Sequence, residues 1–445
     1  MQNLTLQLAE NILSTDFDRL PPEVVREARR GFFNWLGVAI GACRHETIDI
    51  LISMAGFAGA KEQASVLGRE EKTNIFFAAL INGTSSHTFD FDDTHLDTIL
   101  HPSAPVAPAA LAVGEYYGLS GKEVLAAYAL GVEVACRVAV AICPSHYSLG
   151  WHVTGTAGVL GAAAAAGKLL GLDARKMAYA LGIAAAQPVG LREMFGTMTK
   201  PFHPGKAAMN GLMSAWLAKE GFTSSERALE APAGYLKVMA PEYDAAKINS
   251  GWGERFEILA NSYKPYACGV VAHPVITGVV ALREKYNLKP EDVAGIEAQV
   301  NHWVLKLMGK ESPQTGLEAK FSTYHCAAVG LIYGRAGERQ FSDEVVKDER
   351  TVALRKKVKL ITDEKMREDE ARVRIILNDG RVLEEYVGHA KGSRENPMTD
   401  KELEDKYRDL VAGILPPAKI EDSVRLAWDM ENLADVRDLV RACCP

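Results

Sequence analysis

The spacing of apolar residues divides the chain into a helical part and a mixed part. Over the first two-thirds, apolar positions recur at helical intervals, as in residues 21–41, which open with a proline-led first turn. Residues 120–140 begin with Ser-Gly-Lys-Glu, a capping box that marks a helix start before an apolar run. The helical pattern returns after residue 396. We therefore predict a large all-helical domain over residues 1–265, completed by residues 398–445.

Between these helical parts, apolar and polar residues alternate with period two, which is typical of half-buried strands. The alternating segments are residues 296–300, 358–360 and 372–377. The Asn-Asp-Gly run at residues 378–380 predicts a hairpin, because glycine readily adopts the positive φ that such turns need. Helical runs at residues 274–286 and 322–335 lie between the strands. We predict a smaller α+β lid domain over residues 266–397, so the fold class is mainly α with an α+β part.

Composition and charge narrow the class of protein. Apolar residues make up 48% of the chain and charged residues 24%, which is ordinary for a globular protein. The formal charge of −7 argues against a general nucleic-acid binder, which needs a basic face. The longest apolar stretch, residues 155–167, is too short to cross a bilayer, and the chain start has no basic leader. Scattered cysteines indicate reduced thiols. We expect a cytoplasmic protein with no membrane and no nucleic-acid partner.

The first candidate site is the acidic run Phe-Asp-Phe-Asp-Asp-Thr-His at residues 89–95. Three carboxylates within four residues repel one another, so a surface loop gains nothing from them. In one interpretation, a set of carboxylates there holds Mg²⁺ for diphosphate chemistry, because this ion prefers oxygen ligands. The candidate ligands are Asp92, Asp93 and Asp97. Such chemistry normally needs a second acidic cluster, and none has comparable spacing, so we expect no metal.

In the other interpretation, this run supplies acid/base chemistry. Asp90 and Thr94 would lie one turn apart and face a pocket, with His101 of the following His-Pro-Ser as the acid/base partner. A solvated acidic helix end remains the simpler alternative.

Two further motifs carry candidate groups. His152 stands in Gly-Trp-His-Val-Thr-Gly-Thr, where the glycines let the backbone come close to a ligand. Lys200 and His203 lie close together in residues 192–206, where two prolines and two glycines predict an irregular loop ahead of a helix that begins near Lys206. Cationic groups on such a loop favour a corner that binds carboxylates.

The remaining candidates lie at or beyond the predicted domain boundary. Lys264 and His273 are close to it in the sequence, and ligand sites favour clefts between domains. Ser322 is expected to cap a helix, which puts Tyr324 and His325 in its first turn, where the helix terminus favours anions. Ordinary packing at a helix start is the alternative for this pair.

Common catalytic signatures are missing from the sequence. There is no Gly-x-Gly-x-x-Gly after a strand, no P-loop, no Gly-x-Ser-x-Gly and no His-Glu-x-x-His. The cysteines form no tight set of three that would hold an iron–sulfur cluster. The sequence therefore argues against nucleotide, hydride and serine-hydrolase chemistry, and we expect no cofactor.

Taken in order, the motifs resemble the MmgE/PrpD family. The matching runs are "DFDDTH…HPS", "GWHVTGT", "LREMFGTMTKPFHPGKAA", "YKPYACGVVAHP" and "KFSTYHCAAVGLIYGRAG". The family contains 2-methylcitrate dehydratase, cis-aconitate decarboxylase and iminodisuccinate epimerase. The resemblance implies a homodimer with an active site between a helical domain and a lid, without metal or organic cofactor. The pocket positions that it implies are Asp90, Thr94, His101, His152, Lys200 and His273, with Lys264 and His203 close by.

One departure concerns the helix start in the second domain. Where relatives often have a tyrosine just after the Phe-Ser pair, this chain has His325, with Tyr324 one position earlier. The length of 445 residues fits the 2-methylcitrate dehydratase branch less well than the other branches.

The resemblance and the residues together predict an enzyme that acts on small di- or tricarboxylates. We expect His101 and His152 to form the acid/base pair, because imidazole titrates near neutral pH. Asp90 would orient a histidine or act as an acid. Lys200, Lys264 and His203 would bind substrate carboxylates. Dehydration, decarboxylation and epimerisation all stay open, and a non-catalytic dimer that binds carboxylates is the alternative from another class.

Overall fold

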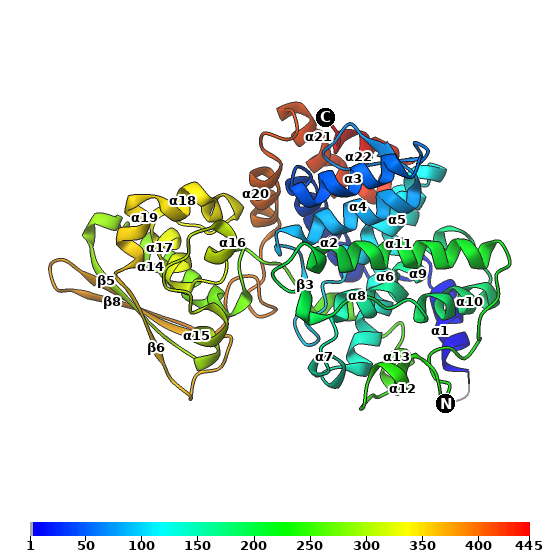
Figure 1. The fold of residues 1–445 in the computed structure, drawn as a ribbon, viewed down its shortest axis with the longest axis horizontal. Coiled ribbons are helices and arrows are strands. Elements are labelled where there is room, and N and C mark those ends of the chain that lie inside the picture. The colour runs from blue at the N-terminus through cyan, green and yellow to red at the C-terminus, as the bar shows by residue number, and fades with distance from the viewer. Residues whose placement is uncertain (1–2) are drawn as a thin grey trace. The chain divides into compact units, whose positions relative to one another are not determined.

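The computed structural model describes residues 3–445 and separates into two compact units (Figure 1). A helical unit comprises Met1–Ser262 and Leu403–Pro445, and a mixed unit comprises Tyr263–Glu402. The sequence placed these boundaries after residues 265 and 397. The mainly helical fold with a smaller α+β part confirms the predicted fold class.

Helices of very different length build the helical unit. From the N-terminal segment these are α1 (Leu4–Ser14), α2 (Pro22–Gly41), α3 (Glu46–Phe57), α4 (Ile75–Thr88), α5 (Ser103–Tyr117), α6 (Gly121–Ile142), α7 (Ser145–Ser148), α8 (Val153–Thr156), α9 (Gly158–Leu169), α10 (Ala174–Ala185), α11 (Thr199–Lys219), α12 (Tyr235–Met239) and α13 (Ala246–Asn249). From the C-terminal segment these are α20 (Asp400–Val411), whose first residues belong to the mixed unit, α21 (Pro417–Trp428) and α22 (Arg437–Ala442). Two short antiparallel pairs join them: β1 (Ala64–Ser65) with β2 (Lys72–Thr73), and β3 (Thr94–His95) with β4 (Asn261–Ser262).

Small residues let the central helices cross closely. A Cβ on Gly131 of α6 would lie 2.7 Å from the carbonyl oxygen of Gly161 on α9, so neither position tolerates a larger residue without movement. A Cβ on Gly83 of α4 would lie 2.8 Å from the Cα of Gly205 on α11. Close crossing of α4 and α11 fixes the ends of both helices, which carry the candidate site described below.

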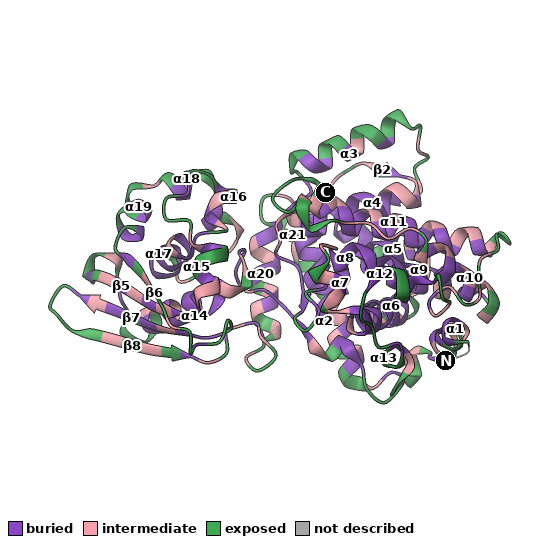
Figure 2. Cartoon of the chain, turned by 60° about the horizontal axis from the view of Figure 1, so that its bottom comes forward, coloured by how far each residue is buried: buried purple, intermediate pink, exposed green. Residues whose placement is uncertain are grey.

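The helix α6 shows how the sequence signals translate into structure. Its first turn has the predicted capping box, in which the Ser120 hydroxyl accepts from the Glu123 amide and the Glu123 side chain accepts from the Ser120 amide. The helix is long and apolar enough to cross a membrane by length and composition, and 94% of its apolar window is buried inside the protein. Figure 2 shows α6 and α9 buried along most of their length, as core helices are.

The mixed unit is built on a four-stranded sheet. Its strands are β5 (Val293–Val300), β6 (Val358–Thr362), β7 (Ala371–Leu377) and β8 (Val382–Val387), in the order β6-β5-β7-β8. The pair β5–β6 is parallel and the other pairs are antiparallel. Its helices are α14 (His273–Tyr286), α15 (His302–Met308), α16 (Gly316–Ala319), α17 (Thr323–Tyr333), α18 (Asp343–Lys347) and α19 (Glu349–Arg355).

Alternation in β7 explains how this sheet is buried. Ala371, Val373, Ile375 and Leu377 face the core, where α14 and α17 pack, and the residues between them are more exposed. The predicted hairpin joins β7 to β8, with Gly380 at a φ of 87°.

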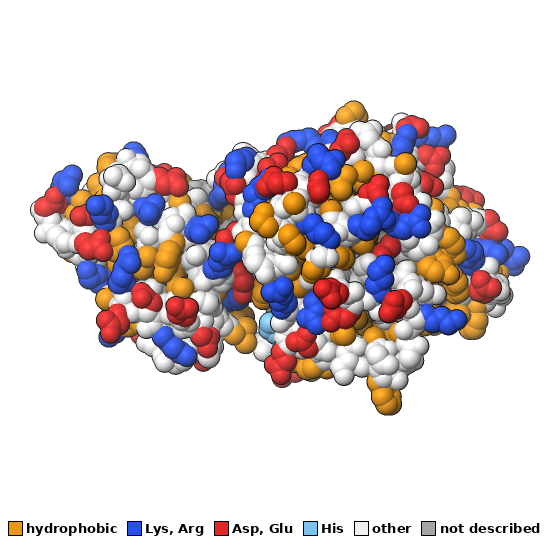
Figure 3. Space-filling view, turned by 90° about the horizontal axis from the view of Figure 1, so that it is seen from above, with side chains coloured by type: hydrophobic (Ala, Val, Ile, Leu, Met, Phe, Trp, Pro, Cys, Tyr) orange, Lys and Arg blue, Asp and Glu red, His pale blue; other side chains and the backbone are white. Residues whose placement is uncertain are grey.

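Charged side chains of both signs are mixed on the surface. On the face of the described chain seen in Figure 3, Lys and Arg alternate with Asp and Glu, and hydrophobic atoms lie between them.

Candidate active site

The acidic run turns into the interior of the helical unit directly after α4. Helix α4 ends at Thr88, and Asp90 adopts a φ of 53°, in the left-handed region that Asp tolerates better than most residues. Beyond this turn, the Lys406 ammonium of α20 donates to the carbonyl oxygen of Phe91 at 2.7 Å. The expectation that Asp90 and Thr94 lie one helical turn apart was wrong, because the helix has ended and Thr94 lies on β3.

Asp92 lies fully buried between two imidazoles. Its Oδ2 accepts from His87 Nδ1 at 2.8 Å, and its Oδ1 lies 3.3 Å from His101 Nδ1. Burial by itself raises the pKa of Asp92, but His87 and His101 beside it hold this pKa well below its usual range. We infer that Asp92 is ionised at neutral pH.

The surroundings of His101 define which of its nitrogens can react. Its Nδ1 lies 2.9 Å from the backbone carbonyl oxygen of Asp93 and 3.3 Å from the Thr94 hydroxyl. A carbonyl oxygen only accepts, so Nδ1 carries a proton. In the neutral ring, Nε2 therefore holds the lone pair that can take a proton. The backbone amide of His101 donates to the Thr154 hydroxyl at 3.2 Å, which joins this segment to α8.

Asp93 points away from this pair and has a different environment. Its Oδ2 accepts from the Ser103 hydroxyl at 2.5 Å and from the Asn261 amide at 2.6 Å. Burial and the neighbouring Asp92 raise the pKa of Asp93 to about 6. These contacts tie the acidic run to the first turn of α5 and to β4, which is a structural role.

His152 and His203 form a second pair of imidazoles. Their Nδ1 atoms lie 3.0 Å apart, and the His152 amide donates to the Gly190 carbonyl oxygen at 3.0 Å. Burial lowers the pKa of His203 to about 4, with Lys200 adding to the effect. Burial, followed by His87 and Lys200, holds the pKa of His152 well below its usual value. Both rings are thus neutral at neutral pH.

Lys200 lies in the first turn of α11. Its ammonium contacts Asp90 Oδ1 at 2.9 Å and stands 5.2 Å from the centre of the Phe195 ring, which in turn meets His152 edge-on at 5.0 Å. The Lys200 and Asp90 side chains are 17% and 34% exposed, whereas His152 is buried. The ion pair therefore lies on the more open side of the histidines.

The predicted irregular loop around Lys200 and His203 is in fact helical. Helix α11 begins at Thr199 and contains Pro204. Pro201 lies in the first turn, where its missing amide would have no helical partner, and Pro204 removes one hydrogen bond to the Lys200 carbonyl oxygen without ending the helix. The prediction of a loop was wrong for this reason.

The helical unit brings six of the predicted residues together. They are Asp90, Thr94, His101, His152, Lys200 and His203. Sequence reasoning missed His87, whose ring centre lies 4.7 Å from that of His101 and 5.6 Å from that of His152. Its only sequence signal is its place three residues before Asp90, which did not distinguish it from an ordinary buried helix residue.

The other four predicted residues belong to the mixed unit. His273 begins α14, with its Nε2 at 3.2 Å from the Cys268 carbonyl oxygen. His325 Nε2 lies 2.9 Å from the Gln340 carbonyl oxygen, and burial lowers the pKa of His325 to about 4. Tyr324, next to His325 in the first turn of α17, is partly buried against the hydrophobic core. The fourth residue is Lys264. The binding roles of all four stay predictions.

Among the described residues, one group of side chains brings possible metal ligands together, but most of their donor atoms are already engaged. His87, Asp90, Asp92 and His101 offer ligand atoms within 4.8 Å of one another. However, Lys200 already contacts Asp90, both oxygens of Asp92 face imidazoles, and His101 Nδ1 is protonated. The donor set therefore fits a network of hydrogen bonds and ion pairs better than a metal cage. The three carboxylates considered for Mg²⁺ do not gather, because Asp97 is exposed and Asp93 faces Ser103.

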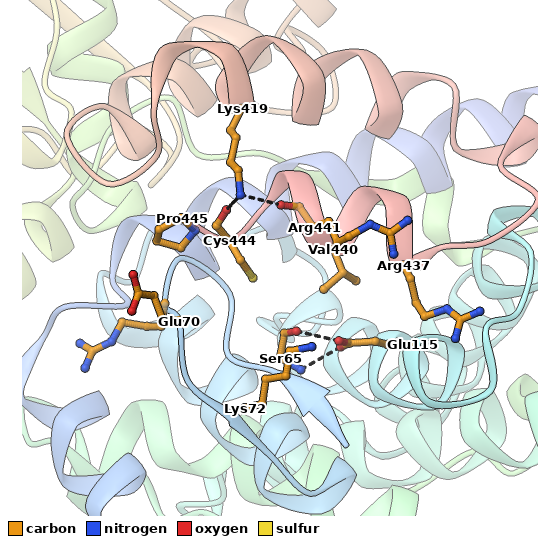
Figure 4. Close-up of a pocket in the computed structure, with 11 residues that line it drawn as sticks. Ser65, Glu70, Lys72, Glu115, Lys419, Arg437, Val440, Arg441, Cys444 and Pro445 are labelled. Atoms are coloured by element: carbon orange, nitrogen blue, oxygen red, sulfur yellow. Dashed lines mark hydrogen bonds between the residues drawn. The ribbon is translucent and has the colours of Figure 1, made fainter. Parts of the chain in front are cut away.

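A cavity of about 440 Å³ lies elsewhere on the helical unit (Figure 4). It is lined by Ser65, Arg69, Glu70, Lys72, Glu115, Lys419, Arg437, Val440, Arg441, Cys444 and Pro445. Lys419 donates to the carbonyl oxygens of Arg441 and Cys444, and Glu115 accepts from Ser65. None of the predicted site residues lines this cavity, and these polar groups satisfy one another.

Comparison with known proteins is consistent with the geometry. Residues 6–247 match the family model of the MmgE/PrpD N-terminal domain, and residues 266–430 match that of the C-terminal domain. Cis-aconitate decarboxylase of Aspergillus terreus is 28% identical, covering 85% of this chain and 84% of that enzyme. The mouse (Mus musculus) cis-aconitate decarboxylase is 27% identical, covering 99% of this chain and 93% of that enzyme. The mitochondrial 2-methylcitrate dehydratase of Yarrowia lipolytica is 26% identical over 31% of this chain and 29% of its own length.

Proposed function

Because this chain belongs to the MmgE/PrpD family, we propose that it is a lyase that acts on a small tricarboxylate, transferring a proton beside a carboxylate without metal or organic cofactor. Decarboxylation of cis-aconitate is the first reaction to test, since relatives of that name match nearly the whole chain. The observation that carries the proposal is the convergence of His101, His152 and Lys200 within one unit.

The chemistry needs one group that exchanges a proton with carbon. When a carboxylate on the carbon next to an alkene leaves as CO₂, the C–C electron pair forms a new double bond, the old π pair moves to the far alkene carbon, and that carbon forms a C–H bond with a proton from an acid. When water is lost instead, a base removes the proton from carbon and an acid protonates the departing hydroxide. His101 Nε2 suits either step, because the fixed proton on Nδ1 leaves Nε2 as the exchanging atom.

His152 supplies a neutral hydrogen-bond donor or acceptor. Burial keeps His152 uncharged, and a neutral imidazole can donate a hydrogen bond to a developing enolate oxygen without first losing a proton. Asp90 and Lys200 lie on the open side of the ring cluster, where an incoming carboxylate meets the ammonium. A polyanionic substrate would thus bind Lys200 while its reacting carbon faces the imidazoles.

A panel of substrates followed by NMR in D₂O tests the proposal. The compounds are cis-aconitate, citrate, 2-methylcitrate and iminodisuccinate. Release of CO₂ with deuterium in the product identifies a decarboxylase, and a new alkene or its hydration identifies a dehydratase. Deuterium exchange with inversion and no other change identifies an epimerase, which would replace the lyase proposal. A folded protein that binds these compounds and turns over none would overturn the proposal in favour of a carboxylate-binding protein.

A further inference from the structure

Two buried groups beside the proposed acid/base pair have no part in the mechanism above. His87 lies in the last turn of α4, and its ring is fully buried between the rings of His101 and His152. Asp92 has no exposed surface either. Burying an ionised carboxylate costs several kcal/mol unless partners compensate it, so its position calls for an explanation.

The protonation of His87 follows from its partner. An ionised Asp92 only accepts, so His87 carries its proton on Nδ1 and directs it at Asp92 Oδ2, 2.8 Å away. The other nitrogen, Nε2, is buried and has no hydrogen-bond partner among the described residues. Burial lowers the pKa of His87 to about 4, so the ring stays neutral and acts as a fixed donor. His87 therefore holds Asp92 in one orientation.

That orientation brings the second oxygen of Asp92 to His101. Oδ1 lies 3.3 Å from His101 Nδ1 without accepting a hydrogen bond from it, and the Nδ1 proton is directed at the Asp93 carbonyl oxygen at 2.9 Å. A negative charge at this distance stabilises an imidazolium far more than it affects a neutral ring. The contact thus becomes stronger at the moment when His101 has accepted a proton on Nε2.

We propose that Asp92 is a positioning residue for His101: held by His87, its carboxylate stabilises the imidazolium that His101 forms during proton transfer, beside the Nδ1–H that the Asp93 carbonyl oxygen already fixes. This inference rests on the proposed function, in which His101 exchanges the substrate proton. The same logic of a carboxylate behind a catalytic imidazole operates in serine hydrolases, on an unrelated fold.

Other charged or titratable groups also lie near His101, and their effects on it must be distinguished from that of Asp92. Asp90 and Asp93 come from the same segment, His87 from α4 and His152 from the residue before α8, while Lys200, from the first turn of α11, contacts Asp90. Asp92 Oδ1 lies 3.3 Å from His101 Nδ1, whereas the Asp90 carboxylate pairs with Lys200 and Asp93 Oδ2 accepts from Ser103. Replacing it should therefore change His101 more than replacing any other carboxylate does.

The test is Asp92→Asn, with Asp97→Asn as the matched control on the exposed surface. We expect kcat to fall by about 100-fold or more with KM changed by less than about threefold, because the carboxylate acts on the imidazolium rather than on substrate. The limb of the kcat/KM profile that reports His101, the acid limb if the ring acts as base and the alkaline limb if it acts as acid, should move about one pH unit lower, because the imidazolium loses its nearest negative charge. Asp97→Asn should leave both unchanged.

A second readout does not depend on turnover. In protein labelled with ¹⁵N-histidine, with signals assigned through His101→Gln, the His101 ring should titrate at lower pH in Asp92→Asn than in the wild type. If the wild type turns over no compound of the panel, the proposed function fails, and this titration still decides the role of Asp92. An unchanged His101 titration together with a lower Tm would show that Asp92 only stabilises the fold, and would overturn the inference.

Variants of His87 keep the inference testable if Asp92→Asn does not fold. His87→Gln retains a donor toward Asp92 Oδ2, whereas His87→Leu removes it. We expect His87→Leu to shift the limb that reports His101 in the same direction as Asp92→Asn, and His87→Gln to restore most of the wild-type profile. Equal profiles for the two variants would contradict the role of His87 as the group that holds Asp92.

Discussion

His152 and His203 place their Nδ1 atoms 3.0 Å apart, so one ring carries its proton on Nδ1 and the other presents a lone pair there. The two rings cannot both be protonated without placing two hydrogens in that contact. Their pKa values, lowered by burial, agree with this restriction. The protonation state of His152 is therefore set by a residue 51 positions away in the sequence.

Removing His203 should impair catalysis through His152. In His203→Ala, the Nδ1 atom of His152 loses its hydrogen-bond partner, and the ring is free to rotate or to change tautomer. We expect kcat to fall by about 10- to 100-fold, in line with the loss of a buried hydrogen bond that orients an acid/base group. Steady-state kinetics with the substrate identified by the panel measure this effect.

His203→Gln is the control, because its amide can still pair with His152. Recovery of most of the activity in His203→Gln supports orientation by hydrogen bonding. If instead both variants keep kcat and raise only KM, His203 binds substrate and does not orient His152.

The two proposed acid/base residues should be needed for turnover but not for folding. We expect His101→Ala and His152→Ala each to lower kcat by about 10²–10⁴-fold, the usual contribution of such groups. His389→Ala, at a half-exposed histidine of the mixed unit, should have no effect. Isothermal titration should show that the two inactive variants still bind the substrate. Loss of binding alone, with kcat intact, would contradict the acid/base assignment.

The outline of the fold could be predicted because local patterns determine it. Helical periodicity and the capping box at Ser120 predicted α6, and alternation predicted β7 together with the turn at Gly380. The start of α11 could not be predicted in this way, because Pro201 and Pro204 look like helix breakers until their places in the first turns are known.

The candidate site was only partly predictable for a related reason. Motif residues with reactive side chains, such as His101 and Lys200, stand out in the sequence. The bridge that Asp92 makes to His87 does not, since it depends on the left-handed turn at Asp90 after α4. Nor does the sequence show which nitrogen of His101 is protonated, because a backbone carbonyl oxygen decides that.

Buried neutral histidines should make the protein less stable in mild acid. The pKa values of His87 and His203 fall from 6.5 to about 4 on folding. Between these pH values the unfolded chain binds protons that the folded protein does not, so the free energy of unfolding falls as pH is lowered. The protonation difference at His87 alone should lower the free energy of unfolding by about 3 kcal/mol over this pH range. Asp93 works in the opposite direction, because its pKa rises to about 6 and the folded state binds its proton first.

Urea unfolding at about pH 7 and about pH 5 measures this dependence. Among the described residues, five histidines with lowered pKa outweigh the two carboxyl groups with raised pKa, Asp93 and Glu133, so the wild type should unfold at lower urea concentration at the lower pH. The difference should shrink in His87→Gln, which cannot take up a proton at that site. A stability that rises on acidification would show that these rings are protonated in the folded state.

Chelation should leave activity unchanged. Lys200 and two imidazoles already contact the carboxylate oxygens that a metal ion would need, so exhaustive dialysis against EDTA should remove nothing that the reaction uses. The measurement is kcat before and after dialysis, with metal content determined on the same samples. Loss of activity that Mg²⁺ or Zn²⁺ restores would instead support a metal held by His87, Asp90, Asp92 and His101.

Gly190 should be essential for placing the two paired histidines. Its φ is 117°, and a Cβ there would lie 3.0 Å from His203 Nδ1 and 3.1 Å from His152 Cβ. Gly150 is the matched control, since its φ is 106° and a Cβ there would meet nothing within 4 Å. Both alanine variants bear similar backbone strain, but only Gly190→Ala pushes on the imidazoles. We expect Gly190→Ala to lower kcat by about tenfold or more beyond Gly150→Ala, because small displacements of catalytic groups are costly. Similar kcat values at similar Tm would show that the rings adjust freely, and that their close pairing does not govern the reaction.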